Sequence, residues 1–368
     1  MKHPDIIIIG SGLMGTATAL NLAGMGKNVA LLEKESNGRH ASAVNAGGVR
    51  RLNRAFEEIP ISVAAGEMWP QLLKIVGDDC GFEPVGQLRI GPGATELKQL
   101  ADRVEKVESL GFFHEELIGP EEVKRLVPAY SGSCSGGIVA RSDGHALPAR
   151  TLKSFVNAAV RAGVKLHTRC HITDISHGSD GFHVRAADGR RFRSETVLNA
   201  AGAWGKQIAA MVGDDLPIEP VGLTMMVTGR MERFLTPVVG IHGHKLSFKQ
   251  MANGTVVIGG GYRAALDMET ENNIVRISEV KKSSKTVVQH FPIMAKSMIV
   301  RCWAGIEGMV SDGLPIIDAS PNIPGLFHVC GFSAHGFQLS PMIGRLAASL
   351  IVGKKPELSL DAFSIGRF

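Results

Sequence analysis

After four residues the chain reads Asp5-Ile-Ile-Ile-Ile-Gly10-Ser11-Gly12-Leu13-Met14-Gly15, an apolar run that passes directly into a glycine-rich turn. The run predicts a buried parallel strand, and the apolar positions after the glycines predict a helix that ends near Gly24 or Gly26. A second strand is expected over residues 28–32, and Glu33 stands at its end. A strand, a glycine turn, a helix and a second strand in this order are typical of an α/β dinucleotide-binding unit.

Each glycine of Gly10-x-Gly12-x-x-Gly15 has its own physical role. Gly10 makes the tight turn, Gly12 lets the backbone approach a pyrophosphate, and Gly15 lets the helix pack on the strand. The phosphates would lie at the helix N-terminus, where free N–H groups and the helix dipole favour anions. Glu33, which follows Gly10 by 23 residues, can accept hydrogen bonds from ribose hydroxyls. The fingerprint predicts a dinucleotide cofactor but does not by itself distinguish FAD from NAD.

Two later segments have the same character. Residues 196–200 predict a buried strand that runs into the turn Ala201-Gly202-Ala203-Trp204. Residues 326–330 predict a strand that ends at Gly331, and a last helix is expected over residues 341–352. The stretch from Gly331 to Ser340 would place a second glycine-rich helix start in the cofactor fold. Such a helix start suits the carbonyl edge of a flavin, which gathers negative charge on reduction.

A length of 368 residues suits roughly two domains. The dinucleotide-binding pattern occurs in three pieces, residues 1–77, 140–212 and 301–368, which we expect to form one discontinuous cofactor domain. Residues 78–139 and 213–300 would form an inserted substrate domain, with alternating strands and a polar helix from about residue 271 to 291. The predicted fold class is α/β, a Rossmann-like domain with an α+β insertion.

Composition argues against several other classes of protein. No apolar run approaches the roughly 18 residues that cross a bilayer, and the N-terminal run is too short for a secretory signal. The five cysteines are scattered without CxxC spacing, which favours reduced thiols in a cytoplasmic protein and argues against an iron–sulfur or zinc site carried by this chain. The net charge of +5 comes from Lys and Arg spread along the chain, so nucleic-acid binding is not expected.

Taken together, these segments resemble the FAD-dependent amino-acid oxidoreductases of the D-amino-acid oxidase superfamily, a group that includes glycine oxidase and sarcosine oxidase. The chain looks most similar to the β subunits of heteromeric members: sarcosine oxidase, dye-linked proline dehydrogenase, hydrogen cyanide synthase and the opine oxidases. The resemblance covers nearly the whole chain. It is carried by the N-terminal fingerprint and by Ser42-Ala-Val-Asn-Ala-Gly-Gly-Val-Arg50, Asn199-Ala-Ala-Gly-Ala-Trp204, Trp303-Ala-Gly305, Asp312-Gly-Leu-Pro315 and residues 331–337.

The resemblance implies an FAD domain, a substrate domain whose large mixed sheet covers the flavin, and hydride transfer to flavin N5 from a carbon that bears an amine nitrogen. Members that attach FAD covalently use a Cys before the C-terminal strand. Residues 316–322 contain none, so non-covalent FAD is expected. The residues expected to contact the cofactor are Gly10, Ser11, Gly12, Leu13, Met14, Gly15, Glu33, Lys34, Ser42, Asn45, Ala46, Gly47, Gly48, Ile172, Ala201, Gly202, Trp204, Gly305, Gly331, Gly336, Phe337, Gln338 and Leu339.

Most of the catalysis expected of the protein is positioning, because an unprotonated amine, a nearby flavin N5 and a clamp for the substrate carboxylate suffice. Arg50 matches the family's carboxylate-binding arginine, and a guanidinium fork suits a carboxylate better than an ammonium does. A structural role is the competing interpretation of Arg50, and Arg51 is the alternative clamp.

Other candidates for the active site are more weakly indicated. Tyr262 borders a strand expected to cover the flavin, and His335 by itself would more often be structural. Gln338 stands where family members carry a lysine that holds the substrate carboxylate, and no lysine occurs over residues 255–258, where the family's oxygen-activating lysine is expected. Glu307 is a candidate to face a cationic substrate.

The resemblance to β subunits predicts a small amino-acid-derived substrate, a secondary amine such as an opine, sarcosine or an imino acid. It also predicts partner subunits that carry iron–sulfur or flavin centres. An FMN at a subunit interface is included in this expectation, although no histidine here matches its attachment site with confidence. Three alternatives stay open at this point: a stand-alone glycine or D-amino-acid oxidase, a flavoprotein subunit that only relays electrons, and an NAD-dependent dehydrogenase.

Overall fold

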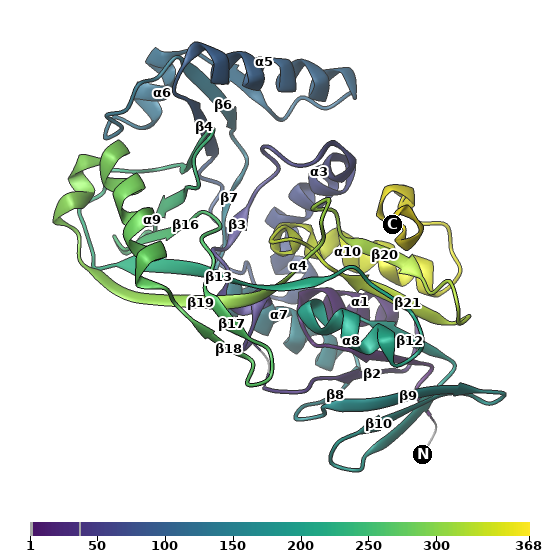
Figure 1. The fold of residues 1–368 in the computed structure, drawn as a ribbon. Coiled ribbons are helices and arrows are strands. Elements are labelled where there is room, and N and C mark those ends of the chain that lie inside the picture. The colour runs from purple at the N-terminus through teal and green to yellow at the C-terminus, as the bar shows by residue number, and fades with distance from the viewer. Residues whose placement is uncertain (1–2, 37) are drawn as a thin grey trace.

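The computed structural model describes residues 3–36 and 38–368, which form two large sheets with helices around them (Figure 1). The first sheet has six strands in the order β20-β21-β12-β1-β2-β8. All neighbours in it are parallel except β20 and β21. Its strands are β1 (Ile6–Ile9), β2 (Val29–Leu32), β8 (Lys165–His167), β12 (Thr196–Asn199), β20 (Ile316–Ala319) and β21 (Leu326–Cys330).

Both faces of this sheet are covered, which explains the unbroken isoleucine run of β1. Ile6 and Ile8 pack against the helices of one face, while Ile7 and Ile9 pack against a small antiparallel sheet and α8 (Gly205–Ala210). The small sheet contains β9 (Ile172–Gly178), β10 (Gly181–Ala186) and β11 (Arg191–Ser194). The helices on the first face include α1 (Leu13–Gly24), α3 (Ile59–Met68), α4 (Leu72–Val76), α7 (Pro148–Arg161) and α10 (Gly336–Ile351).

The second sheet has eight strands in the order β19-β13-β16-β15-β14-β4-β6-β5. It is mixed, because β14 and β4 are parallel whereas the other neighbours are antiparallel. The expected α/β fold with a large mixed sheet is therefore confirmed. The strands are β4 (Gln87–Gly91), β5 (Glu116–Ile118), β6 (Gly136–Ala140), β13 (Glu219–Thr228), β14 (Val238–Ile241), β15 (Ser247–Gln250), β16 (Val256–Gly259) and β19 (Ile299–Met309). The exact division into two domains stays a prediction.

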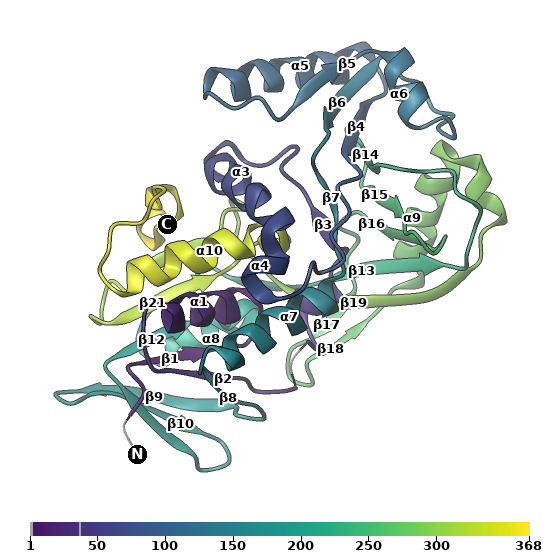
Figure 2. The ribbon, with the colours of Figure 1, turned by 180° about the vertical axis from the view of Figure 1, so that it is seen from behind.

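Three helices pack on the large sheet (Figure 2), two of them with Val139 of β6 and the third, α5 (Ala94–Ser109), with Ile138 and Ala140 on the opposite face. Phe248 of β15 packs with Phe291, which directly follows α9 (Ile277–His290). Because side chains alternate along a strand, Lys249 points to the opposite face of the sheet from α9. The other helix on the α9 side is α6 (Pro120–Leu126).

The helix expected from about residue 271 begins later, at Ile277. The residues before it form a hairpin of β17 (Ala265–Asp267) and β18 (Asn272–Ile274). The carboxylate of Asp267 accepts hydrogen bonds from the backbone N–H groups of Glu269 and Thr270, at 2.9 and 3.3 Å. This local turn competes with helix formation, which sequence periodicity does not show.

The last helix begins earlier than expected, at Gly336, and contains Pro341. A proline inside a helix leaves the carbonyl four residues before it without its usual donor. Here the hydroxyl of Ser340 donates to the Phe337 carbonyl at 2.9 Å, which replaces that hydrogen bond. The helix start therefore lies directly after the Gly331 turn.

Between β2 and α3 the described chain contains two short elements that lead toward the site. They are α2 (Ala41–Val44) and β3 (Gly48–Val49), and β3 pairs with β7 (Gly144–His145). Among the described residues, no helix combines the length and the apolar character needed to span a bilayer.

Candidate cofactor and substrate site

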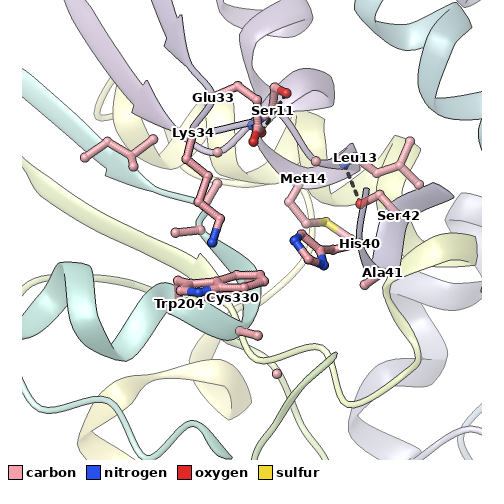
Figure 3. Close-up of a pocket in the computed structure, with 18 of the residues that line it drawn as sticks. Ser11, Leu13, Met14, Glu33, Lys34, His40, Ala41, Ser42, Trp204 and Cys330 are labelled. Atoms are coloured by element: carbon pink, nitrogen blue, oxygen red, sulfur yellow. Dashed lines mark hydrogen bonds between the residues drawn. The ribbon is translucent and has the colours of Figure 1, made fainter. Parts of the chain in front are cut away.

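A large cavity lies at the carboxyl ends of β1, β2, β12 and β21, the edge at which open α/β sheets bind ligands. Figure 3 shows side chains of the fingerprint, of residues 40–42 and of Trp204 around it. Most of the predicted cofactor residues form its wall. They are Gly10, Ser11, Gly12, Leu13, Met14, Glu33, Lys34, Ser42, Asn45, Ile172, Ala201, Gly202, Trp204, Gly331, Gly336 and Phe337.

The turn between β1 and α1 leaves no room for side chains at two glycines. Gly10 has a φ of +103°, and a Cβ there would lie 2.4 Å from the Ala200 carbonyl oxygen. A Cβ on Gly15 would lie 2.0 Å from the Gly10 carbonyl oxygen. The first turn of α1 holds no acidic side chain, so the positive end of its dipole meets the cavity. The turn therefore fits the pyrophosphate of a dinucleotide.

The Glu33 carboxylate lies in the cavity wall and is held from two directions. Its Oε2 accepts hydrogen bonds from the backbone N–H and the hydroxyl of Ser11, both at 2.9 Å. Its Oε1 accepts one from the backbone N–H of Glu35 at 3.0 Å. A fixed carboxylate at the end of the second strand fits the ribose hydroxyls of a dinucleotide.

The side chains of Lys34 and His40 both approach the Trp204 indole in the cavity (Figure 3). The Nζ of Lys34 lies 3.3 Å from the centre of the indole, and the His40 ring lies 4.6 Å from it on centroids. Lys34 also forms an ion pair with Glu271, from the turn between β17 and β18. Burial lowers the pKa of His40 to about 4, so this imidazole is neutral at pH 7.

The wall beside Glu33 is apolar. Ile172 of β9, Ile208 of α8 and Leu32 of β2 pack together there, with Met211 at their edge. An apolar surface next to a carboxylate that fits a ribose suits an adenine ring.

A carboxyl withdrawn from bulk solvent faces the cavity where α10 begins. Desolvation raises the pKa of Glu307, on β19, to about 7, and a hydrogen bond from the backbone N–H of Ala334 opposes this rise. Glu307, Ala334 and Gly336 all line the cavity. The site thus combines a helix N-terminus, which favours negative charge, with a carboxyl that is partly neutral at pH 7.

Seven predicted cofactor residues lie outside this cavity wall in the described chain: Gly15, Ala46, Gly47, Gly48, Gly305, Gln338 and Leu339. Gly305 packs against α2, where a Cβ would lie 2.6 Å from Val44 Cγ2. Two residues earlier on β19, the Trp303 indole N–H donates to the Val44 carbonyl at 2.7 Å. These contacts bring the large sheet close to the loop after α2.

Ala46 and Gly48 instead line a second, smaller cavity, together with Lys249 of β15. Lys249 is 4% exposed, and its amino group donates to the Ala46 carbonyl. Burial lowers the pKa of Lys249 to about 7, while Glu83 is the acidic group that opposes this shift. A lysine with a pKa near neutrality beside the expected flavin loop can hold or release a proton there.

Arg50, the predicted clamp, forms hydrogen bonds to its own loop through one guanidinium nitrogen. Its Nη1 donates to the carbonyls of Leu52 and Asn53, at 2.8 and 3.0 Å. Arg51, the alternative, is engaged by Asp143, which accepts from its Nε at 2.8 Å and from its backbone N–H at 2.7 Å. The structure therefore gives Arg51 a structural ion pair.

Gln338 is completely buried and bonds another arginine, Arg54. Its Oε1 accepts from Arg54 Nη2 at 3.2 Å and from the Ser62 hydroxyl at 3.0 Å. Its Nε2 donates to the Ser62 carbonyl at 2.8 Å. These contacts give Gln338 a positioning role toward Arg54.

His335 lies beside the same arginine, with Nδ1 3.2 Å from Glu58 Oε1. Burial lowers the pKa of His335 to about 4, with a further contribution from the Arg54 charge. The pKa of Glu58 is lowered as well, because the hydrogen bond from His335 and the nearby arginines outweigh its burial. A neutral His335 therefore donates to an ionised Glu58.

The Tyr262 side chain points toward α9. Its hydroxyl lies 3.3 Å from the hydroxyl of Thr286 on α9, the helix on the far face of the large sheet from Lys249. Nothing in this contact brings the phenol to either cavity.

The strand–turn–helix arrangement, the carboxylate and the glycine-rich α10 start agree with the match of residues 5–350 to the family of FAD-dependent oxidoreductases called DAO. The chain belongs to this family. Its cavity fits FAD: Gly10 and the α1 N-terminus would hold the pyrophosphate, Glu33 the ribose, and the start of α10 the flavin edge.

Relatives of this FAD-dependent oxidoreductase span its full length. Glycine oxidase of Geobacillus kaustophilus is 26% identical over 99% of this chain and 97% of its own. An opine oxidase subunit of Rhizobium meliloti is 25% identical over 100% and 98%. The crystal structure of the Geobacillus glycine oxidase matches with a TM-score of 0.92 at 24% identity over 100% of both chains. L-Proline dehydrogenase of P. horikoshii matches with a TM-score of 0.91 at 24% identity over 99% and 97%.

Sequence reasoning missed two residues of this region, Arg54 and Lys249. Arg54 lies only four positions beyond Arg50. The cluster of three arginines over residues 50–54 could have indicated that Arg54 lies near the expected clamp. Lys249 was missed because the side chains of the strand that contains it were expected to alternate between the core and solvent. The large sheet is covered on both sides at β15, which places Lys249 in the interior.

Proposed function

We propose that this FAD-dependent oxidoreductase oxidises the C–N bond of an amino-acid derivative, a secondary amine such as an opine, sarcosine or an imino acid. FAD supplies the hydride acceptor, its N5 atom. The observation that carries the proposal is a pair of arginines, the half-buried Arg50 and the buried Arg54, between the start of α10 and the large sheet. A guanidinium withdrawn from solvent is suited to a carboxylate, which an amino-acid-derived substrate provides. The relatives named for glycine, opines and L-proline support this substrate class.

Arg50 is the proposed carboxylate clamp. Because its Nη1 is bonded to Leu52 and Asn53, the edge formed by Nε and Nη2 is the one that would donate two hydrogen bonds to a carboxylate. The hydrogen bonds to the loop fix the plane of the guanidinium before substrate arrives, so less conformational entropy is lost on binding.

For the electrons, we propose transfer to a partner subunit or an external acceptor. The opine oxidase relative and the sarcosine oxidase β chain of Rhizobium meliloti are both named as subunits, and this chain aligns with them over its whole length. The partner would carry an iron–sulfur or flavin centre. We do not propose an FMN at a subunit interface, because the names of the relatives and solved structures given above do not point to one.

A stand-alone oxidase that forms hydrogen peroxide is the second candidate. It is favoured by one observation, the nearly complete overlap with glycine oxidase of Geobacillus kaustophilus. The two candidates differ in how fast oxygen reoxidises the reduced flavin.

The test is anaerobic bleaching of the FAD-loaded protein by N-alkyl amino acids, imino acids, D-amino acids and opines. We expect one of these classes to reduce the flavin. If none does, while dithionite still bleaches it, the chain is an electron relay. Reoxidation is then followed with oxygen and with an acceptor dye. Reoxidation by oxygen at the rate of turnover would favour the oxidase over the partner-dependent enzyme.

A further inference from the structure

The hairpin of β17 and β18 links the large sheet to the cofactor cavity. Its base is fixed to the large sheet, where Asn273 Nδ2 of β18 donates to the Ala304 carbonyl of β19 at 3.4 Å. In Figure 1 the hairpin lies below β13 and β19. Its turn, residues 268–271, reaches Lys34, which follows β2 of the six-stranded sheet.

Glu271, the last residue of this turn, has a backbone conformation that is uncommon for its residue type. Its φ is +53°, in the left-handed region that glycine and asparagine adopt more readily. Its carboxylate forms an ion pair with Lys34, and the two side chains are only 20% and 19% exposed. Within the described chain, this ion pair joins the turn to the six-stranded sheet. A strained backbone held at one enclosed contact indicates a constraint beyond the hairpin itself.

The Lys34 ammonium lies over the indole of Trp204, with Nζ 3.3 Å from the ring centre (Figure 3). Lys34 follows β2, whereas Trp204 follows β12, and β1 lies between these two strands in the sheet. The two side chains therefore meet across the carboxyl end of β1, where the Gly10 turn begins. This is the part of the cavity that fits the pyrophosphate.

FAD is wider at its two ends than in the middle, because a narrow pyrophosphate joins the adenosine to the flavin ring system. Glu33 and Ile172 suit the adenosine end, and the start of α10 suits the flavin end. A side-chain contact across the middle of such a ligand would oppose the movement of either end past it.

Glu271 acts on this contact through the charge and the direction of Lys34. Burial lowers the pKa of Lys34, whereas the hydrogen bond and the charge of Glu271 oppose this shift. The ion pair thus favours the ammonium form, which is attracted to the face of the indole, whereas a neutral amine is not. It also holds a long, flexible side chain in the direction of Trp204.

We propose that Lys34, Trp204 and Glu271 form a clasp over the middle of bound FAD, which opens for the cofactor to enter or leave. Glu271 is a positioning residue in this clasp, because it acts through Lys34 and not by contact with FAD. The large sheet thereby contributes to the retention of a cofactor that the six-stranded sheet binds. This inference concerns the cofactor alone, so it goes beyond the proposed oxidation and does not depend on which amine is the substrate.

The experiment measures the rates at which FAD enters and leaves the protein. Association is followed by the change in flavin fluorescence after FAD is mixed with the flavin-free protein, and dissociation by the exchange of bound FAD for isotope-labelled FAD. In Glu271→Gln we expect both rate constants to rise about fivefold, the size of one ion pair. Because the ion pair does not touch FAD, the Kd should change by less than about twofold.

Glu269→Gln is the matched control, because Glu269 is an exposed residue of the same turn and the change in charge is the same. It should leave both rate constants as they are in the wild-type protein. Lys34→Gln removes the same ion pair from its other partner and should also raise both rate constants. The double variant of Lys34→Gln and Glu271→Gln should be no faster than Lys34→Gln alone, because the two residues act through one contact.

Faster dissociation with an unchanged association rate would show that Glu271 stabilises only the FAD-bound state, and would overturn the clasp. Unchanged rates in Glu271→Gln would overturn it as well. So would a double variant in which the two accelerations multiply, because Glu271 would then act independently of Lys34.

Discussion

The amino group of Lys249 donates a hydrogen bond to the backbone carbonyl of Ala46. This contact joins the inner face of the large sheet to the loop expected to lie along the flavin. Lys249 is also directly opposite Val257 in the pairing of β15 with β16. The lysine missing from residues 255–258 therefore has a counterpart on the neighbouring strand, at the same level of the sheet.

Lys249→Met should stabilise the protein without FAD, and more so at pH 7 than at pH 10. The folded pKa of about 7 lies below the ordinary value of 10.5, so the unfolded chain binds more protons between these values and stability rises with pH there. The cost of burying the charge is thus greatest at and below pH 7. Thermal unfolding at the two pH values checks this. An equal gain in Tm at both would show that Lys249 is not titrating.

Gly15→Ala should abolish FAD retention, because the added Cβ would lie 2.0 Å from the Gly10 carbonyl and push α1 away from β1. The control is Gly24→Ala at the other end of α1, where a Cβ meets no atom within 4 Å. Flavin content after purification measures both. Retention of flavin by Gly15→Ala at the level of the control would contradict the assigned role of the turn.

The FAD of the wild-type protein should be released by acid precipitation, because no cysteine occurs over residues 316–322. Absorbance and mass analysis of the supernatant identify the flavin. A yellow pellet would mean a covalent bond from another residue.

Arg50→Lys should weaken the substrate more than FAD, with a loss of roughly 1.5–3 kcal/mol for a bidentate charge-assisted contact. The kcat/KM is compared for the substrate and its decarboxylated analogue. An equal loss for the two compounds would exclude Arg50 as the clamp.

Glu307→Gln should stabilise the FAD-free protein more at pH 8 than at pH 5. The folded pKa of about 7 lies above the ordinary value of 4.5, so the cost of the desolvated charge grows as pH rises between them and is complete above pH 7. Glutamine keeps the acceptor for the Ala334 N–H without the charge. Chemical denaturation at pH 5 and pH 8 tests this, and a gain that does not depend on pH would count against a titrating Glu307.

The cofactor cavity was largely predictable because its determinants are local. Gly10, Gly12 and Glu33 act within one strand–turn–helix–strand unit, and the strand order at the sheet edge follows from that unit. The contacts of Arg54 could not be predicted from the sequence. Arg54 meets Gln338 across 284 positions of sequence, and this contact depends on how α3 packs against α10. The direction of the Tyr262 side chain could not be predicted either, because its segment borders the large sheet but a contact with α9 determines where the phenol points.

The hydroxyl of Ser42 accepts a hydrogen bond from the backbone N–H of Leu13, at 3.0 Å. The first turn of α1 and the segment leading to the expected flavin loop are therefore joined by a hydrogen bond. We therefore expect that the nucleotide half and the flavin half of FAD do not bind as independent ligands. Free energy gained at the α1 N-terminus would also lower the entropy cost of ordering residues 42–48, which would link the two half-sites thermodynamically.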